Sequence, residues 1–169
     1  GIVNAIFFNQ GHVCCAGSRL LVQEGVADTV IDLLKKRMQY LIIGDPLDKK
    51  TDIGAVNSRT QLETIQRYVD TGIKEGASCY ECSGTLPNKG FYFPPTLLTG
   101  VSQSSTVVQE EIFGPVLTIQ TFRTTEEAIE KANNTPYGLA NGIWTDKGSK
   151  IFHVGTKLKS GVVWSNTYN

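Results

Sequence analysis

Apolar residues along the chain fall alternately into short continuous runs and into helical spacings, with turn-forming residues between them. The run SRLLVQE at residues 18–24 is typical of a short buried strand. Beyond it, apolar residues recur three, four and seven positions apart among charged ones, at Val26, Val30, Leu33, Leu34, Met38 and Leu41. This spacing predicts an amphipathic helix over residues 26–40 whose apolar stripe faces the core.

A second helix is predicted to begin at Ser58, because Gln61 stands three residues later in the capping-box position. Gly76 is a natural end for this helix. Its expected core stripe is Leu62, Ile65, Val69 and Ile73. The preceding segment IGDPLDKKTDIGAV, residues 43–56, is rich in turn residues and poor in apolar ones, so we expect it to cross the surface.

The second half of the chain continues the alternation of strands and helices. Its strand-like segments are ASCYECSG, LANGIWT and GVVWSN, at residues 77–84, 139–145 and 161–166, and a further strand is expected after the Gly-Pro break at residues 114–115. The segment GFYFPPTLL, residues 90–98, is expected to be extended with a proline break. Thr124 and Glu127 signal a third capped helix, and a further helical stretch is expected near residues 147–158. Strands that alternate with helices over short loops predict an α/β fold with a mostly parallel, helix-covered sheet.

Composition limits the classes of protein to which the chain can belong. Its 169 residues suffice for one domain with a core, and 16 basic residues balance 16 acidic ones. A neutral chain gives no electrostatic reason to expect nucleic acid or an anionic membrane as a partner. No apolar run approaches the ~20 residues of a membrane span, and no signal-type segment opens the sequence. Both ends read as interrupted elements, so we expect a part of a longer protein.

The stretch FNQGHVCCAGSR contains two adjacent cysteines among small residues, at Cys14 and Cys15. Small neighbours leave space for a partly exposed nucleophilic thiol, with backbone N–H groups near enough to stabilise an oxyanion. The alternative is that both are packed thiols, because free cysteine is among the most buried residue types. His12 is a candidate base, but a surface histidine is the better account of it.

Cys79 and Cys82 form a second cysteine pair, with the spacing of a metal knuckle or a redox motif. A zinc ribbon needs two such knuckles, and the Cys14–Cys15 spacing does not supply the other. Positions 79 and 82 of a strand also face opposite sides of the sheet. We therefore predict core or edge thiols and no metal site. Because adjacent cysteines do not easily bond and a chain of this size needs no disulfides, an intracellular, cytoplasmic location is expected.

The stretch QEEIFGPVLTI, residues 109–119, places two carboxylates before an Ile-Phe pair and a Gly-Pro break. The glutamates could simply be solvated on a loop. Alternatively, a carboxylate at the end of an element could accept hydrogen bonds from ligand hydroxyls, with Phe113 offering a flat apolar surface. Composition alone leaves both readings open.

Together these stretches resemble the catalytic domain of the NAD(P)-dependent aldehyde dehydrogenase superfamily. FNQGHVCCAGSR resembles its cysteine signature, EEIFGPV its second motif, and ANNTPYGLANGIWT followed by GVVWSN its later segments. The resemblance covers essentially the whole chain. It implies oxidation of a small-molecule aldehyde to a carboxylic acid with NAD or NADP, through a thiohemiacetal and a thioester on cysteine.

The resemblance also implies roles for particular residues. It places the nucleophile at Cys14, whose backbone N–H contributes to the oxyanion hole. It assigns Glu111 to the hydroxyls of the nicotinamide ribose and Phe113 to packing against the cofactor. Gln61 is a further candidate for the ribose, although its neighbourhood matches less well. The signature has His12 where glutamine is common, which could alter the approach to Cys14.

The resemblance further implies that residues 1–169 are a partial catalytic domain. The family's cofactor-binding domain, its general-base glutamate and its oligomerisation segment are expected outside this sequence. The full-length protein is then expected to be a homo-oligomer, and residues 1–169 alone to be inactive or nearly so. Two alternatives stay open: a non-catalytic scaffold that keeps the fold, and a thiol hydrolase in which His12 or His153 is the base.

Overall fold

A computed structural model describes all residues of the chain, 1–169. The elements in order are α1 (Ile2–Phe7), a 3-10 turn (Phe8–Gly11), β1 (Arg19–Gln23), a 3-10 turn (Glu24–Val26), α2 (Ala27–Met38), α3 (Arg59–Lys74), β2 (Ser78–Glu81), β3 (Thr96–Thr99), α4 (Thr106–Gln109), β4 (Val116–Phe122), α5 (Thr125–Asn133), β5 (Ala140–Ile143), α6 (Gly148–Gly155) and β6 (Val162–Ser165). The predicted strands and helices are present. The short helices α1 and α4 were not predicted.

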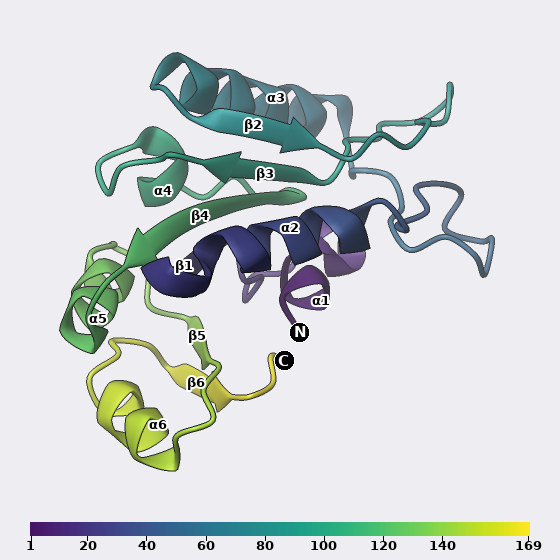
Figure 1. Ribbon diagram of the computed structural model, residues 1–169. Helices are drawn as coiled ribbons and strands as arrows, with labels where there is room; N and C mark the ends of the chain where they lie inside the picture. Colours follow the sequence, from purple (N-terminus) through teal and green to yellow (C-terminus); the bar gives the residue numbers. More distant parts are fainter.

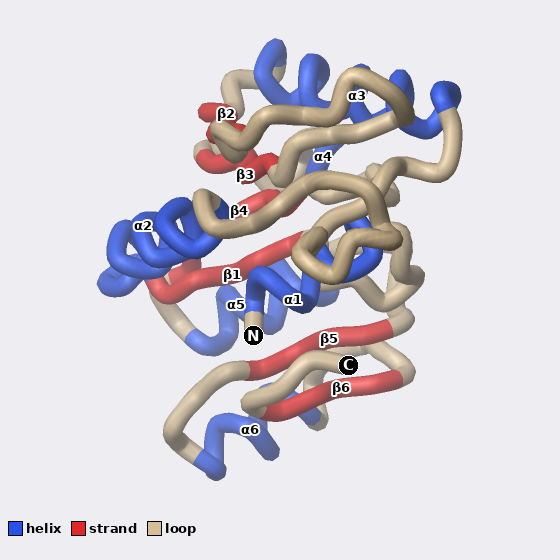
Figure 2. The backbone as a smooth tube through the Cα atoms, turned by 90° about the vertical axis from the view of Figure 1, so that its right-hand side faces the viewer, coloured by secondary structure: helices blue, strands red, loops and turns tan.

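The strands form two separate sheets. The larger has the order β1-β4-β3-β2, in which β1, β4 and β3 are parallel and the edge strand β2 is antiparallel to β3. The smaller contains only the parallel pair β5 and β6. Both views place this pair and α6 beyond the β1 edge of the larger sheet (Figures 1 and 2). The α/β class with a mostly parallel sheet is confirmed.

The two central strands of the larger sheet, β3 and β4, are buried on both faces. On β3, Leu97 and Leu98 are both fully buried, and since neighbouring strand residues point to opposite faces they belong to different cores. Leu97 lies in the core beneath α1 and α2, and Leu98 lies in the core beneath α3 and α4. Burial on both faces explains why these strands read as continuous apolar runs rather than as alternating ones.

Helix α2 confirms the predicted element but corrects the predicted stripe. Leu34 and Met38 are buried as expected, whereas Val26 and Leu33 are 50% and 60% exposed. The helix packs through Ala27, Val30, Ile31, Leu34 and Met38, and the predicted Leu41 is buried in the same core just after it. Ala27, Ile31, Leu34 and Met38 are four, three and four residues apart. The buried stripe therefore keeps the helical period, but its centre is shifted by one residue from the predicted positions Val26 and Leu33.

The segment 43–56 is only partly the surface excursion that its composition predicts. Its tip, residues 45–50, is exposed. Ile43 and Ile53 are buried and joined by a parallel bridge, and Val56 is buried in the core beneath α3. Three well-spaced apolar residues are therefore enough to fix both ends of this loop to the domain.

Helix α3 begins and ends as predicted. The Ser58 hydroxyl accepts a hydrogen bond from the backbone N–H of Gln61, and Gly76 follows the helix with a φ of 101°. Ile65 and Val69 are buried in the stripe, but Ile73 is 47% exposed, so the stripe ends one turn earlier than predicted. The side chain of Gln61 does not return to close a capping box; it reaches another segment. No helix in the chain has both the length and the apolar character needed to span a bilayer.

Candidate functional site

Cys14 and Cys15 stand at the centre of a tight turn. The turn is closed by a hydrogen bond from the N–H of Ala16 to the carbonyl of Val13, at 2.9 Å. The Cys14 side chain is exposed and that of Cys15 is partly buried. Neither cysteine donates its own N–H to another backbone group. The turn therefore presents an accessible thiol together with free backbone donors, the combination that a nucleophile attacking a carbonyl needs.

The turn is held in place on both sides. Gly17 donates its N–H to the carbonyl of Ala5 in α1, at 2.8 Å. On the other side, Gly11 has a φ of 74°, and a side chain at this position would collide with the carbonyl oxygen of Gly114. This close backbone approach is available only to glycine. It joins the cysteine turn to the EEIFGPV segment, about 100 residues later in the sequence.

Phe113 lies at this junction in an unusual backbone conformation. Its φ is 54°, in the left-handed region that aromatic residues rarely occupy. The amide of Gln61 donates to the carbonyls of Ile112 and Phe113, each at 3.0 Å. The ring of His12 stacks on the Phe113 ring, with centroids 5.3 Å apart and planes 26° apart. The Phe113 side chain is still 37% exposed, so a part of the ring stays open to a ligand.

The two adjacent glutamates have different environments. Glu110 accepts a hydrogen bond from the Tyr68 hydroxyl at 2.8 Å, and this bond is the main cause that raises the pKa of Tyr68. Glu111 is anchored only through its backbone N–H, which donates to the Tyr137 hydroxyl at 3.2 Å. Its carboxylate is exposed and forms no ion pair or hydrogen bond within the chain. Of the two carboxylates, Glu111 is the one available to a ligand.

His12 is not the surface histidine that the sequence suggested. Its ring is partly buried, and the backbone N–H of Asn57 donates to Nε2 over 3.5 Å. Burial lowers the pKa of His12, and the Asn57 side chain opposes this in part. Its side-chain contacts run to Asn57 and Phe113, not to the Cys14 thiol. His153 is exposed on α6, 3.6 Å from a Glu126 carboxylate oxygen. The geometry therefore offers Cys14 no histidine base.

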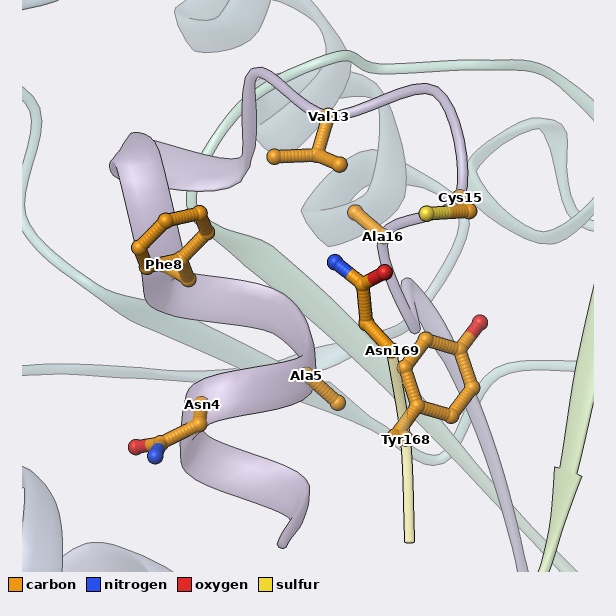
Figure 3. A pocket seen from close by; sticks show the side chains of 8 residues that line it. All are labelled: Asn4, Ala5, Phe8, Val13, Cys15, Ala16, Tyr168 and Asn169. Atoms are coloured by element: carbon orange, nitrogen blue, oxygen red, sulfur yellow. The ribbon is translucent and has the colours of Figure 1, made fainter. Parts of the chain in front are cut away.

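A pocket of about 210 Å³ opens beside the cysteine turn. It is lined by Asn4, Ala5, Phe8, Val13, Cys15, Ala16, Tyr168 and Asn169, from α1, the turn and the chain end (Figure 3). Cys15 lines it and Cys14 does not. Burial, together with the nearby Cys15 thiol, raises the pKa of Tyr168 to about 12, so this wall stays uncharged at neutral pH. The mainly apolar lining suits an uncharged organic molecule.

Some site residues carried no signal in the sequence. Asn57, Tyr137 and Tyr168 contact the predicted residues only because distant segments fold together.

The remaining cysteine pair is split between environments: Cys79 is exposed on β2, and the Cys82 thiol is buried and donates to the carbonyl of Met38 at 3.1 Å. Burial of part of the Cys79 side chain raises its pKa, which disfavours a reactive thiolate there.

The fold and the loops together define an α/β domain in which an exposed cysteine turn packs against a segment bearing a free carboxylate and an open aromatic ring. A model of the aldehyde dehydrogenase family matches residues 1–169, and the chain belongs to this family.

Known relatives agree in sequence and in structure. The chain is 44% identical over 168 residues to aldehyde dehydrogenase B of Escherichia coli, covering 96% of this chain and 32% of that protein. It is 39% identical over 165 residues to a human mitochondrial aldehyde dehydrogenase, covering 98% and 32%. A Bacillus cereus aldehyde dehydrogenase solved with NAD+ superposes with a TM-score of 0.95 at 41% identity, over 100% of this chain and 34% of that one. The chain thus spans about a third of the length of these relatives.

Proposed function

We propose that residues 1–169 are the thiol-bearing part of an NAD(P)-dependent aldehyde dehydrogenase that oxidises a small-molecule aldehyde to its carboxylic acid. The observation that carries the proposal is the contact between the exposed cysteine turn and the Ile112–Gly114 backbone, made where Gly11 meets Gly114. This contact unites the proposed nucleophile and the proposed cofactor residues in one site. The full-length protein is proposed to be a homo-oligomer.

In this proposal Cys14 is the nucleophile. Its deprotonated sulfur forms a C–S bond with the aldehyde carbon, and the carbonyl oxygen becomes an oxyanion in a thiohemiacetal. The free N–H of Cys14 lies on the same turn and donates to that oxygen. NAD+ or NADP+, when bound, supplies the acceptor for the hydride that leaves the former aldehyde carbon. The acyl group stays on Cys14 as a thioester until water releases the acid and restores the thiol.

The residues near the turn fit a nicotinamide cofactor. The open part of the Phe113 ring offers an apolar surface, and the unpaired Glu111 carboxylate offers two acceptors for ribose hydroxyls. The amide of Gln61 donates to the Ile112 and Phe113 carbonyls, so we assign it to holding Phe113 in place. Its contact with the ribose stays a prediction.

The proposed nucleophile is tested by mild alkylation with iodoacetamide, followed by mass spectrometry of the labelled peptides. We expect Cys14 to react first, ahead of Cys15, Cys79 and Cys82, because it is exposed at the tip of a turn with free N–H donors. Cys14→Ser should abolish the fast phase. Cys79→Ser is the matched control, since it removes another exposed thiol whose pKa is raised.

Equal, slow labelling of Cys14 and Cys79 would contradict the proposal and favour the non-catalytic scaffold.

A second measurement concerns turnover. Because residues 1–169 correspond to about a third of the relatives, this stretch alone is expected to turn over no aldehyde with NAD. Measurable production of NADH by the purified stretch would overturn that expectation.

A further inference from the structure

We propose that His12 is a positioning residue that, in its neutral form, holds Phe113 in the conformation that opens its ring to the ligand side. The inference rests on the proposed function only in taking the cofactor as the ligand that Phe113 contacts. The coupling between His12 and Phe113 is a property of this chain by itself. No histidine base is involved, since the His12 ring does not contact the Cys14 thiol.

Phe113 needs to be held because its backbone is strained. A phenylalanine with a φ of 54° persists only where the surroundings over-determine it. Gln61 fixes the backbone from one side through the carbonyls of Ile112 and Phe113. This leaves the ring itself to be fixed, and the stacked ring of His12 is the aromatic partner that the structure provides.

The contacts of His12 and Gln61 close into a circuit. Nε2 of His12 accepts the N–H of Asn57, whose side-chain oxygen accepts the Ser58 hydroxyl. Ser58 caps helix α3 by accepting the N–H of Gln61, and Gln61 reaches Phe113. The stack of Phe113 on His12 completes the circuit. Movement of His12 is therefore transmitted to Phe113 directly and also through the start of α3.

The protonation state of His12 decides whether the circuit closes. Because Nε2 accepts a hydrogen bond, the proton of the neutral ring is assigned to Nδ1, which is buried without a partner. An imidazolium would bear N–H groups on both nitrogens. One would then face the N–H of Asn57, and the positive charge would lie in a partly buried place. Protonation thus removes the anchor of the ring on the α3 side.

The other ionisable groups near this circuit are already accounted for. Arg59 at the start of α3 lies over the Phe91 ring, Glu110 is bound by Tyr68, and Glu111 is exposed before Phe113. On its own loop the nearest ionisable group is the Cys14 thiol. Burial lowers the pKa of His12, the Asn57 side chain opposes this in part, and no charged neighbour contributes.

The sign of the pH dependence follows from that direction. Since the folded-state pKa of His12 lies below the ordinary histidine value of 6.5, the unfolded chain binds more protons in this range than the folded chain does. The stabilisation by neutral His12 is complete above pH 6.5. It is lost progressively as the pH falls through the folded-state pKa.

The test follows the His12 ring and the Phe113 backbone amide by NMR as the pH is lowered from about 8 to about 4, the range over which histidine and then glutamate titrate. In the native sequence, the Phe113 amide should shift in two steps. One step should share its midpoint with the His12 ring, below pH 6.5, and the other should be independent of that ring. In His12→Phe, which keeps an aromatic ring but has no titratable nitrogen, the first step should vanish and the second remain.

His153→Gln is the matched control, because it removes the other histidine at an exposed position on α6 and should leave both steps unchanged. If His12→Phe does not fold, the proposal is still tested in the native chain, by whether the Phe113 amide and the His12 ring share a midpoint. A Phe113 amide that does not move while His12 titrates would overturn the proposal, as would a first step that survives in His12→Phe. The NMR test needs no cofactor, so its outcome does not depend on whether the chain belongs to an active aldehyde dehydrogenase. Failure of the proposed function would be seen in the iodoacetamide labelling instead.

Discussion

At the scale of single residues, the site depends on one backbone contact that side chains would prevent. Three consecutive residues with positive φ, Asn9, Gln10 and Gly11, lead the chain out of α1 towards the cysteine turn. Only the last is glycine, and it is the one that meets the carbonyl of Gly114. Strained residues persist only where the surrounding structure holds them. Here the strained residues 9–11 place the cysteine turn against the Phe113 segment.

Gly11→Ala is therefore expected to destabilise the fold by roughly 2–4 kcal/mol, because the methyl group both clashes and disfavours the positive φ. Urea unfolding measures the loss. Gly25→Ala is the control, since nothing lies within 4 Å of an added Cβ there and its φ is not positive. A loss in Gly11→Ala no larger than that in Gly25→Ala would show that the two segments do not meet as described.

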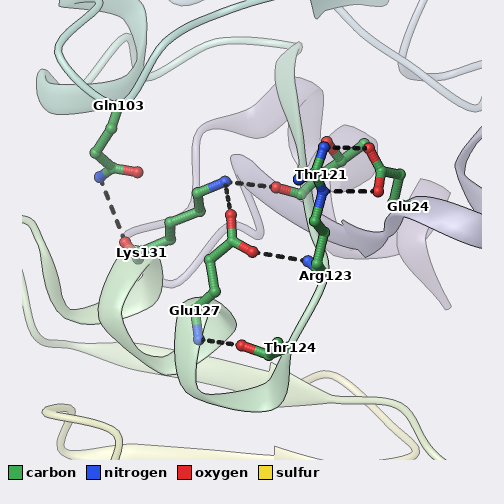
Figure 4. A network of polar contacts seen from close by, with 7 residues as sticks. All are labelled: Glu24, Gln103, Thr121, Arg123, Thr124, Glu127 and Lys131. Carbon is green, nitrogen blue, oxygen red and sulfur yellow. Dashed lines mark hydrogen bonds and ion pairs between the residues drawn. The ribbon is translucent and has the colours of Figure 1, made fainter.

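At the scale of elements, local hydrogen bonds define where helices begin. The Thr124 hydroxyl accepts the N–H of Glu127 at 3.1 Å, and the Glu127 carboxylate accepts the N–H of Arg123 at 2.8 Å (Figure 4). Lys131 adds an ion pair to the same carboxylate at 2.7 Å. The exposed pair of Arg123 with Glu24 adds little, because solvent screens it. The cap of α5 is thus the main local determinant of this end.

Thr124→Ala should cost about 1 kcal/mol of unfolding free energy, the usual effect of removing a capping oxygen. Thr124→Ser keeps that oxygen and should lose much less. Thermal unfolding of the two variants side by side measures the difference. Equal losses would mean that the threonine methyl group, rather than the cap, is responsible.

At the scale of the whole molecule, the two sheets are unequally supported. Neither core cluster includes a residue of β5, α6 or β6, and none of these elements contains a buried residue. Contacts of Trp144 and Trp164 with Tyr168 join this part to the chain end beside the pocket. Elements with few buried apolar contacts open at lower free energy than the rest of a protein.

Native-state hydrogen exchange should therefore show β5 and β6 opening before β3 and β4. The β3 and β4 amides serve as the internal control, because Leu97, Leu98 and Leu117 on these strands are fully buried. Exchange of all four strands with one common free energy would indicate a single cooperative unit. That outcome would contradict the unequal support described above.

The sequence by itself determined most of the elements. The caps at Ser58 and Thr124 and the end at Gly76 are local, since each involves residues within a few positions, and they were predicted correctly. The apolar period predicted α2 and α3, and the short apolar runs predicted strands of a helix-covered sheet. Local rules fail where the apolar period does not determine which face of a helix is buried. Leu33, which was predicted in the core stripe of α2, is exposed for this reason.

Only the tertiary structure decided how the site is assembled. That Glu110 is bound by Tyr68 while Glu111 stays free depends on residues about 40 positions apart. The stack of His12 on Phe113 and the reach of Gln61 to the same segment span still longer separations. The physical reason is that a backbone or side-chain polar group takes whichever partner folding brings near, and sequence spacing does not record distant partners. The chain thus specifies its helices and strands locally, and its site only through the packing of those elements.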